Sequence, residues 1–214
     1  MLDKEYLNIH RKRFENTIDI IKSQGLIKDG DSILSLGCIS FFKDFLLESF
    51  DVLFVETKTD LRYDIEFNDC EFDFVLCLEV IEHIKDQESS DFEDIACFNS
   101  SGIRNLIKES HRVLSSGGSM LVSTPNLHCY KTLYNWIERK QLFTYEPHPR
   151  ELSQEYLEKE LKNKFNIVDC FYKNSWHGHG VPEDFVEKAK KILDVLDLDT
   201  ENREEDNLFI VCKK

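Results

Sequence analysis

A continuous apolar run near the middle of the chain ends in three side chains that can hold or move protons. Residues 72–78 read Phe-Asp-Phe-Val-Leu-Cys-Leu, and Glu79, Glu82 and His83 follow. Such a run is typical of a strand that is buried on both faces of a parallel sheet. Ligands of open α/β sheets bind where such strands end, and histidine is the natural base near neutral pH. We therefore expect polar chemistry at the end of this strand.

Other histidines are further candidates, and each also has an ordinary structural interpretation. His148 lies in the segment Pro-His-Pro-Arg-Glu over residues 147–151, and His111 has the spacing of a packing residue on a predicted helix. His83 has an alternative role as a residue at the start of a helix, bonded to the backbone. The pair in His177-Gly178-His179 is too closely spaced, in a loop without a fixed carboxylate partner, to indicate a metal site. We predict no metal site from the sequence.

Strands and helices alternate over residues 31–124, and these elements must position the polar side chains. The predicted elements are a strand over 31–36, a helix over 41–48, strands over 52–56 and 74–78, a helix that ends at Gly117-Gly118, and a strand over 120–123. A short link through Tyr63-Asp64-Ile65 precedes the 74–78 strand. The apolar 52–56 run suits burial on both faces. This alternation predicts an α/β fold, a doubly wound and mostly parallel sheet with helices on both faces.

The segments on either side of this region complete one predicted domain over residues 1–214. Residues 1–30 form a leading helical segment that ends near Gly25. After Pro125, aromatic residues and histidines accumulate, which indicates a lid or acceptor-side segment over 125–165 with a helix that begins near Ser153. Residues 166–214 are predicted to contain two strands and, between them, a helix opened by Pro182. Its predicted inner face carries Phe185, Val186, Ala189, Ile192, Leu193 and Leu196.

Composition narrows the range of partners. The chain has 214 residues, 41% of them apolar, which suits one domain with a full core. Lys and Arg total 27 against 41 Asp and Glu, a net charge of −14, so we expect no nucleic acid and no membrane as partners. Residues 1–13 lack the apolar core of a signal peptide, and no apolar run approaches the ~20 residues that span a bilayer. We predict a cytoplasmic protein.

Three motifs occur in a recognisable order. The first is Glu79-Val80-Ile81-Glu82-His83 after Phe72-Asp73, the second is Arg112-Val113-Leu114-Ser115-Ser116-Gly117-Gly118, and the third is Ser123-Thr124-Pro125-Asn126. In combination they resemble the later motifs of the class I S-adenosylmethionine-dependent methyltransferases, over roughly residues 31–214. The resemblance implies S-adenosylmethionine as the cofactor and residues 31–124 as the cofactor-binding half. It also implies a seven-stranded sheet that ends in an antiparallel strand pair.

The resemblance implies four cofactor-binding residues on the second and later strands. Glu56 matches the acid that hydrogen-bonds the two ribose hydroxyls, a task that suits a carboxylate. Asp64 matches a residue often found near the adenine amino group. Leu78 and Glu79, at the end of the central apolar run, complete this part of the predicted site.

The turn after the first strand departs from the family pattern. Gly37 keeps the first glycine, but Ile39 and Phe41 stand where the family has the second and third, and Ser35 stands where it has an acid. Glycine at these positions allows the backbone to approach the cofactor without a Cβ atom in the way. We expect Ile39 to crowd the cofactor. The predicted cofactor contacts in this turn are Ser35 and Gly37.

The acceptor is predicted only as a class. The Ser-Thr-Pro-Asn segment and the Pro-His-Pro-Arg-Glu segment resemble the branch of the family that acts on glycans, quinones and other metabolites, which implies O-methylation of a small metabolite or sugar. His148, or else His83, is then the predicted base for the acceptor hydroxyl. The altered turn favours an alternative, a catalytically silent methyltransferase-like domain that serves as a binding or scaffolding partner. The sequence leaves the oligomeric state open.

Overall fold

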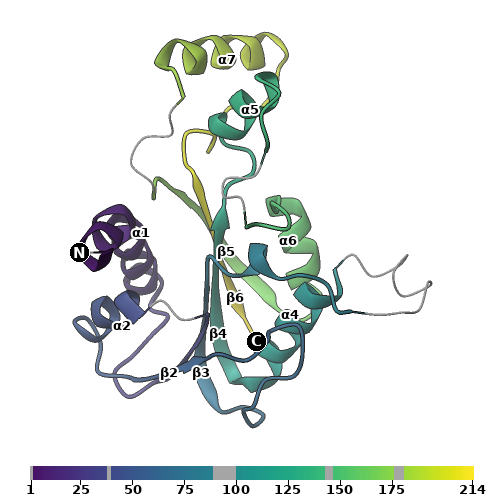
Figure 1. Cartoon of the computed structure of the whole chain (residues 1–214). Coiled ribbons are helices and arrows are strands. Elements are labelled where there is room, and N and C mark those ends of the chain that lie inside the picture. The colour runs from purple at the N-terminus through teal and green to yellow at the C-terminus, as the bar shows by residue number, and fades with distance from the viewer. Residues whose placement is uncertain (1, 38–39, 89–99, 143–146, 176–180) are drawn as a thin grey trace.

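A sheet of six strands runs through the computed structural model, which describes residues 2–37, 40–88, 100–142, 147–175 and 181–214. The strands are β1 (Ser32–Leu36), β2 (Leu53–Thr57), β3 (Phe72–Leu78), β4 (Leu114–Pro125), β5 (Asn166–Lys173) and β6 (Asn207–Lys213). Their order is β2-β1-β3-β4-β6-β5, and β6 lies antiparallel between β4 and β5 (Figure 1). The predicted α/β fold with a C-terminal antiparallel pair is confirmed.

Helices cover both faces of the sheet. As Figure 1 shows, α1 (Leu2–Gln24) and α2 (Ser40–Leu47) lie on one side, and α4 (Ser101–Val113) and α6 (Gln154–Leu161) on the other. Ser153 caps α6 as predicted, because its hydroxyl accepts a hydrogen bond from the backbone of Tyr156. No helix within the described ranges is long and apolar enough to cross a bilayer.

The central strand β3 contributes to a separate core on each face. Phe74 and Leu76 pack into the cluster that contains Phe14 of α1, whereas the intervening Val75 and Cys77 pack into the cluster that contains Ile103 of α4. Side chains of a strand alternate between the two faces, so an unbroken apolar run is required where both faces are covered. This explains the 72–78 run.

The sheet has one strand fewer than predicted. Residues 58–71, all of them described, join β2 to β3 as turns and loop without a helix or strand. Arg112 of α4 holds this loop by donating hydrogen bonds to the carbonyls of Ile65 and Phe67. Consequently β2 is an edge strand, and Leu53 is 63% exposed. The expectation that this strand is buried on both faces was wrong.

The predicted end of the helix before Gly117-Gly118 was also wrong. α4 ends at Val113, and β4 begins at once with Leu114. The pairing of β3 with β4 shifts between Phe72 and Phe74, so that Phe74 lies opposite Ser119. Gly117, with φ of +77°, lies in the extra length of β4 that this shift leaves. The glycine pair therefore forms an irregularity inside a strand instead of a helix cap.

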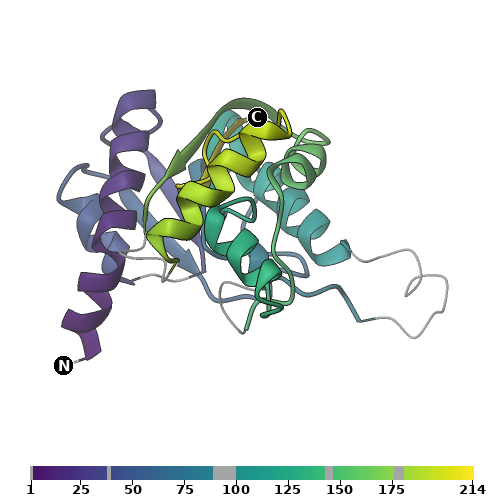
Figure 2. The same cartoon turned by 90° about the horizontal axis from the view of Figure 1, so that it is seen from above.

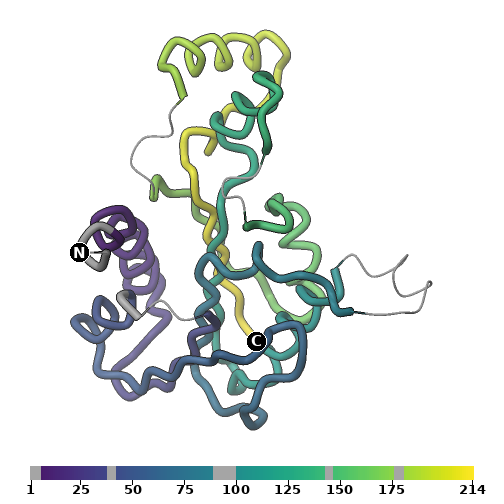
Figure 3. Tube along the Cα trace, in the orientation of Figure 1, coloured from purple at the N-terminus to yellow at the C-terminus, as the bar shows by residue number. Residues whose placement is uncertain are grey.

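Two helices pack together beyond the carboxyl ends of the parallel strands. α5 (Tyr130–Ile137) follows β4, and α7 (Glu183–Val195) lies beside it in both views (Figures 1 and 2). The trace in Figure 3 shows that the chain enters this pair from β4 and returns from it through β6. The rings of Tyr134 and Phe185 meet at 5.0 Å. Ala189 is buried, but Ile192 and Leu196 are each 59% exposed because α7 packs on α5 and not on the sheet, so the predicted inner face of α7 was partly wrong.

Candidate active site

The ends of β1 and β2 bring three of the predicted cofactor residues together. Ser35, which is buried, lies in register with Glu56 of β2. Glu56 is half-buried, and its Oε1 atom is shielded from solvent. Gly37 follows directly after β1. A carboxylate therefore stands beside the turn after β1, as binding of a ribose diol requires.

Gly37 is essential to the shape of this turn for two reasons. Its φ of +79° is in the left-handed region, which side chains other than glycine rarely adopt. A Cβ atom on Gly37 would lie 2.5 Å from Cγ2 of Val80, which follows β3. The turns after β1 and β3 can thus pack closely only because Gly37 has no side chain. Ile39 lies outside the described residues, so its crowding effect stays a prediction.

The residue after β3 is held in place from three other elements. Glu79 has φ of +54°, also in the left-handed region. Its Oε1 atom accepts hydrogen bonds from Ser123 of β4 (2.7 Å) and Asn207 of β6 (2.9 Å). Nη1 of Arg13 in α1 lies 3.8 Å from Oε2, and both side chains are buried. Leu78, at the end of β3, is buried.

A second cluster follows in the short 3-10 helix η1 (Ile81–His83). Glu82 is fully buried, and Thr124 of β4 donates a hydrogen bond to its Oε2 atom at 3.2 Å. Its Oε1 atom lies 3.9 Å from Nε2 of His148. His148 is also buried, and its Nδ1 atom is 2.9 Å from Oε1 of Glu151. Burial, and then the charge of Glu79, raises the pKa of Glu82 well above its usual range.

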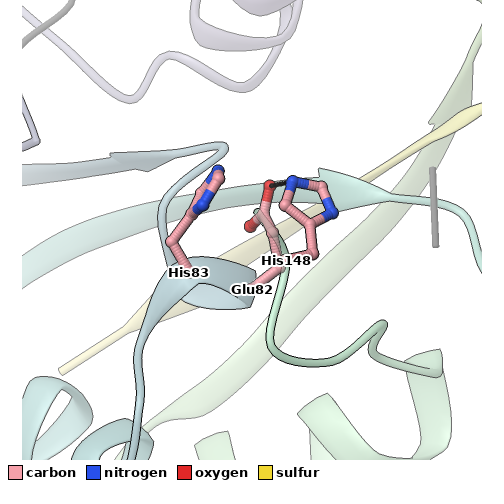
Figure 4. Close-up of side chains that lie close together, drawn as sticks. All are labelled: Glu82, His83 and His148. Carbon is pink, nitrogen blue, oxygen red and sulfur yellow. Dashed lines mark ion pairs between the residues drawn. The ribbon is translucent and has the colours of Figure 1, made fainter. Parts of the chain in front are cut away.

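The two predicted histidines meet at this point. The ring of His83 contacts the ring of His148 edge to face, with 4.4 Å between centroids (Figure 4). His83 is exposed, so the cluster opens to the surface on its side. Burial of the ring, followed by the neighbouring His148, lowers the pKa of His83 from its usual value. The structure therefore brings His83 and His148 together, with Glu82 between β4 and the two rings.

One predicted residue does not join the others. The side chain of Asp64 is 82% exposed, and its carboxylate lies 3.7 Å from the ammonium group of Lys108 in α4. This places Asp64 on the outer surface of the loop that joins β2 to β3. A contact with adenine stays a prediction for Asp64.

An open cavity of about 440 Å³ adjoins the histidine cluster. Its walls include Glu151, which holds His148, and the ion pair between Arg150 and Asp86 (2.8 Å). Ser100 and Tyr156 line it as well. Small-molecule sites are typically of this size, with a few polar groups that orient the ligand. A polar metabolite would fit here.

Sequence reasoning missed three residues that complete the two clusters. Arg13 lies in the leading helix, and no motif there predicted its contact with Glu79. Glu82 was named among the polar side chains that follow the 72–78 strand but was not predicted as a catalytic or binding residue, although a carboxylate next to His83 was a visible signal. Glu151 lies three residues after His148, a spacing that allows the two side chains to meet, and this was a second available signal.

Comparisons with known proteins agree with this geometry. A family described as "Methyltransferase domain" matches residues 9–168. No curated protein matches the sequence. A solved S-adenosylmethionine-dependent methyltransferase from Archaeoglobus fulgidus is 14% identical, with a TM-score of 0.57 and 94% of each chain covered.

Two further solved structures have the same fold. A putative sarcosine dimethylglycine methyltransferase from Galdieria sulphuraria is 14% identical, with a TM-score of 0.57 and with 94% of this chain and 85% of that chain covered. The N-methyltransferase NodS from Bradyrhizobium japonicum WM9, solved with S-adenosylhomocysteine, is 14% identical, with a TM-score of 0.55 and coverage of 95% and 86%. The family match spans most of the chain, and the present protein accordingly belongs to the class I methyltransferases, the family whose methyl donor is S-adenosylmethionine.

Proposed function

We propose that this protein transfers a methyl group from S-adenosylmethionine to a hydroxyl oxygen of a small polar metabolite or sugar. The observation that supports this most is the meeting of Glu82, His83 and His148 directly after β3, beside the edge where the cofactor residues lie. Methyl transfer to a hydroxyl requires alignment of the two reactants and removal of one proton. The cluster offers groups suited to the second task.

The residues at the ends of β1, β2 and β3 fit the cofactor in most respects. Glu56 has the position and burial to hold the ribose hydroxyls, and Ser35 and Gly37 lie next to it. Leu78 and Glu79 border the same edge, and the contacts of Glu79 with Ser123, Asn207 and Arg13 keep its carboxylate stationary. When bound, S-adenosylmethionine supplies a methyl group activated by the positive sulfur.

The acceptor is assigned to the cavity beside Glu151. Its walls carry the charged side chains of Arg150 and Asp86, which suit an acceptor with hydroxyl groups. One of the solved structures is described as an N-methyltransferase and another as a putative sarcosine dimethylglycine methyltransferase, but at 14% identity they share only the fold with this chain. An amine of moderate pKa reacts without a base, whereas a hydroxyl needs one. The buried glutamate and paired histidines therefore favour oxygen as the methylated atom.

Cofactor binding by Glu56 can be measured by calorimetry with S-adenosylhomocysteine. The Glu56→Ala variant should bind more weakly by about 1–3 kcal/mol, because the ribose hydroxyls lose a charged acceptor. Glu66→Ala is a matched control, since Glu66 is an exposed carboxylate in the nearby loop. Equal affinity in the two variants would remove Glu56 from the site.

The acceptor can be sought among sugars and phenolic metabolites with methyl-labelled cofactor. With an acceptor in hand, His148→Ala should lower turnover by about 10²–10⁴-fold while affinity for S-adenosylhomocysteine stays near that of the unmodified protein. His128→Ala is the control, because His128 is exposed in the same segment of the chain. Undiminished turnover in the His83→Ala/His148→Ala double variant would contradict a role for these histidines.

A catalytically silent domain is the second candidate, and a specific observation favours it. Ser35 stands at the place of the family's acid, and the turn after β1 retains only Gly37 of the family's glycines. Measurable binding of S-adenosylhomocysteine without transfer to any class of acceptor would favour a binding or scaffolding role. Transfer to any acceptor would exclude that role as the protein's sole activity.

A further inference from the structure

A buried carboxylate oxygen stands at the centre of the histidine cluster. Glu82 is 0% exposed, and only one of its two oxygens accepts a hydrogen bond, from Thr124. No hydrogen-bond donor from the described part of the chain reaches the other oxygen, Oε1. Buried polar atoms are almost always paired, and an exception calls for an explanation such as a bound ion. Oε1 of Glu82 points toward the two histidine rings (Figure 4).

His148 is oriented as metal-binding histidines usually are. Its Nδ1 atom lies 2.9 Å from the buried carboxylate of Glu151, so a proton on Nδ1 is held there as a hydrogen bond to Glu151. The lone pair then remains on Nε2, which faces Oε1 of Glu82 at 3.9 Å. Histidine ligands of metals generally donate their second ring N–H to a carboxylate or carbonyl in this way, which fixes the tautomer.

His83 supplies a third donor atom on the open side of the cluster. One ligand atom each from Glu82, His83 and His148 lies within 4.8 Å of the others. Ligand atoms bound to one ion at about 2.0–2.2 Å lie roughly 3–3.5 Å apart in a tetrahedral arrangement. Small side-chain rotations would close this difference. The ring of His83 already contacts that of His148.

We propose that Glu82, His83 and His148 bind a single divalent cation of the zinc type at the carboxyl end of β3. Two imidazoles and one carboxylate suit zinc and its first-row neighbours, whereas Mg²⁺ and Ca²⁺ prefer ligand sets made of oxygen. Three protein ligands leave a fourth position for a further ligand, as at catalytic zinc sites. No sequence motif predicted this site, because His83 belongs to η1 and His148 to the distant segment before α6.

The role of the ion rests on the proposed function. An acceptor hydroxyl that occupies the fourth position would lose its proton to solvent more readily, because a bound cation lowers the pKa of an attached hydroxyl. The oxygen then forms a bond to the methyl carbon as the bond from that carbon to sulfur breaks. The products are the methyl ether, S-adenosylhomocysteine and one proton. With the ion bound, the two histidines act as ligands and not as the base.

The test is a calorimetric titration of the chelator-treated protein with Zn²⁺ alone, repeated with Mg²⁺. We expect one tightly bound Zn²⁺ and no comparable binding of Mg²⁺. Glu82→Gln, which keeps the side-chain shape, and the surface variant His83→Ala should each lower Zn²⁺ affinity at least 10-fold. Glu151→Gln should lower it as well, by about 10–100-fold, because Glu151 orients a ligand without touching the ion.

Matched controls exclude binding at other histidines. His128→Ala removes an exposed histidine, and the His177→Ala/His179→Ala double variant removes the closely spaced pair in the sequence; both should bind Zn²⁺ with unchanged affinity. Absence of Zn²⁺ binding, or binding that both Glu82→Gln and His83→Ala leave unchanged, would overturn the proposal. His83→Ala keeps the test valid even if the buried Glu82 variant does not fold.

The same samples separate this proposal from the proposed function. Methyl transfer by metal-free protein, with the rate unchanged by added Zn²⁺, would overturn the metal site's role and leave the methyltransferase function standing. One Zn²⁺ bound at these residues in a protein that does not bind S-adenosylhomocysteine would support the site and contradict the proposed function.

Discussion

At the scale of single residues, two backbone conformations shape the predicted cofactor edge. Glu79 has φ of +54°, which costs about 1 kcal/mol for a residue with a side chain. Hydrogen bonds from Ser123 and Asn207 to its carboxylate offset that cost. Strained residues of this kind cluster at functional sites. Gly37, directly across from Val80, has the other unusual conformation, and there the absence of a side chain is what allows it.

Gly37→Ala should lower the free energy of unfolding by about 2–4 kcal/mol, because the new Cβ adds both backbone strain and an overlap with Val80. Gly117→Ala is the matched control, since Gly117 has a similar φ of +77° but no atom within 4 Å of the added Cβ. It should lose only about 1–2 kcal/mol. Urea unfolding of both variants measures the difference.

The overlap itself can be isolated by removing its partner. Val80→Ala in the Gly37→Ala background should restore part of the lost stability, beyond what the two single variants predict by addition. Equal losses in Gly37→Ala and Gly117→Ala would show that contact with Val80 contributes nothing and that the backbone conformation alone matters.

At the scale of elements, the loop over residues 58–71 joins β2 to β3 without a helix or strand. Side chains of α4 hold it, above all Arg112, which donates hydrogen bonds to the carbonyls of Ile65 and Phe67 and pairs with Asp69 (2.8 Å) and Glu109 (2.7 Å). Asn105 also donates to the carbonyl of Tyr63 (2.7 Å), and Glu109 accepts from the backbone N–H of Ile65 (3.1 Å). Glu109 is buried, and its partner Arg112 holds the pKa of that carboxyl below its usual value against the effect of burial. The loop joins the strand that carries Glu56 to β3.

Arg112→Ala should therefore lower the free energy of unfolding by about 2–4 kcal/mol, because it leaves two loop carbonyls and the buried Glu109 without their guanidinium partner. Arg112→Lys should lie in between, since an ammonium cannot form the paired hydrogen bonds. Lys108→Ala is the control: the Lys108 ammonium group lies 3.7 Å from the same Glu109 but is 58% exposed, so its loss should cost less than ~0.5 kcal/mol. Chemical denaturation that gives equal losses for Arg112→Ala and Lys108→Ala would contradict this account.

At the scale of the whole molecule, the proposed sites for the cofactor and for the acceptor lie on different elements. The predicted cofactor-binding residues lie at the ends of β1, β2 and β3, and the proposed acceptor cavity lies toward α6. The leading helix α1 reaches the cofactor edge through Arg13, while α5 and α7 pack beyond the strand ends (Figure 1). Binding of the cofactor should thus stabilise the whole α/β unit, since its contacts join strands far apart in the chain.

S-adenosylhomocysteine at about 100 times its Kd should raise the unfolding free energy by ~2.7 kcal/mol, which corresponds to roughly 5–10 °C in Tm for a domain of this size. Glu56→Ala at the same ligand concentration should show a smaller shift, whereas the exposed-site control Glu66→Ala should match the unmodified protein. A Tm that does not change at any ligand concentration would contradict cofactor binding and favour the silent-domain alternative.

The sequence by itself determined the order of the elements and the residues at the end of β3. Apolar runs, glycines and capping residues act over a few neighbouring positions, so the alternation of strands and helices, the cap at Ser153 and the start of α7 were all visible in it. The sequence did not determine the number of strands, because residues 58–71 have no pattern that distinguishes a short strand from a loop. Hydrogen bonds from the distant Arg112 hold this segment as a loop.

Only the tertiary structure decided which polar groups meet. Glu82 lies opposite His148 because the chain after β4 returns along the carboxyl edge before it forms α6, and Arg13 reaches Glu79 because α1 packs across the sheet. Such contacts depend on how separate elements pack, and packing is set by the summed shape of many side chains. Local spacing therefore identified the histidines as candidates, whereas the burial of Glu82 beside His148 and the contact of Glu151 with His148 came from the fold.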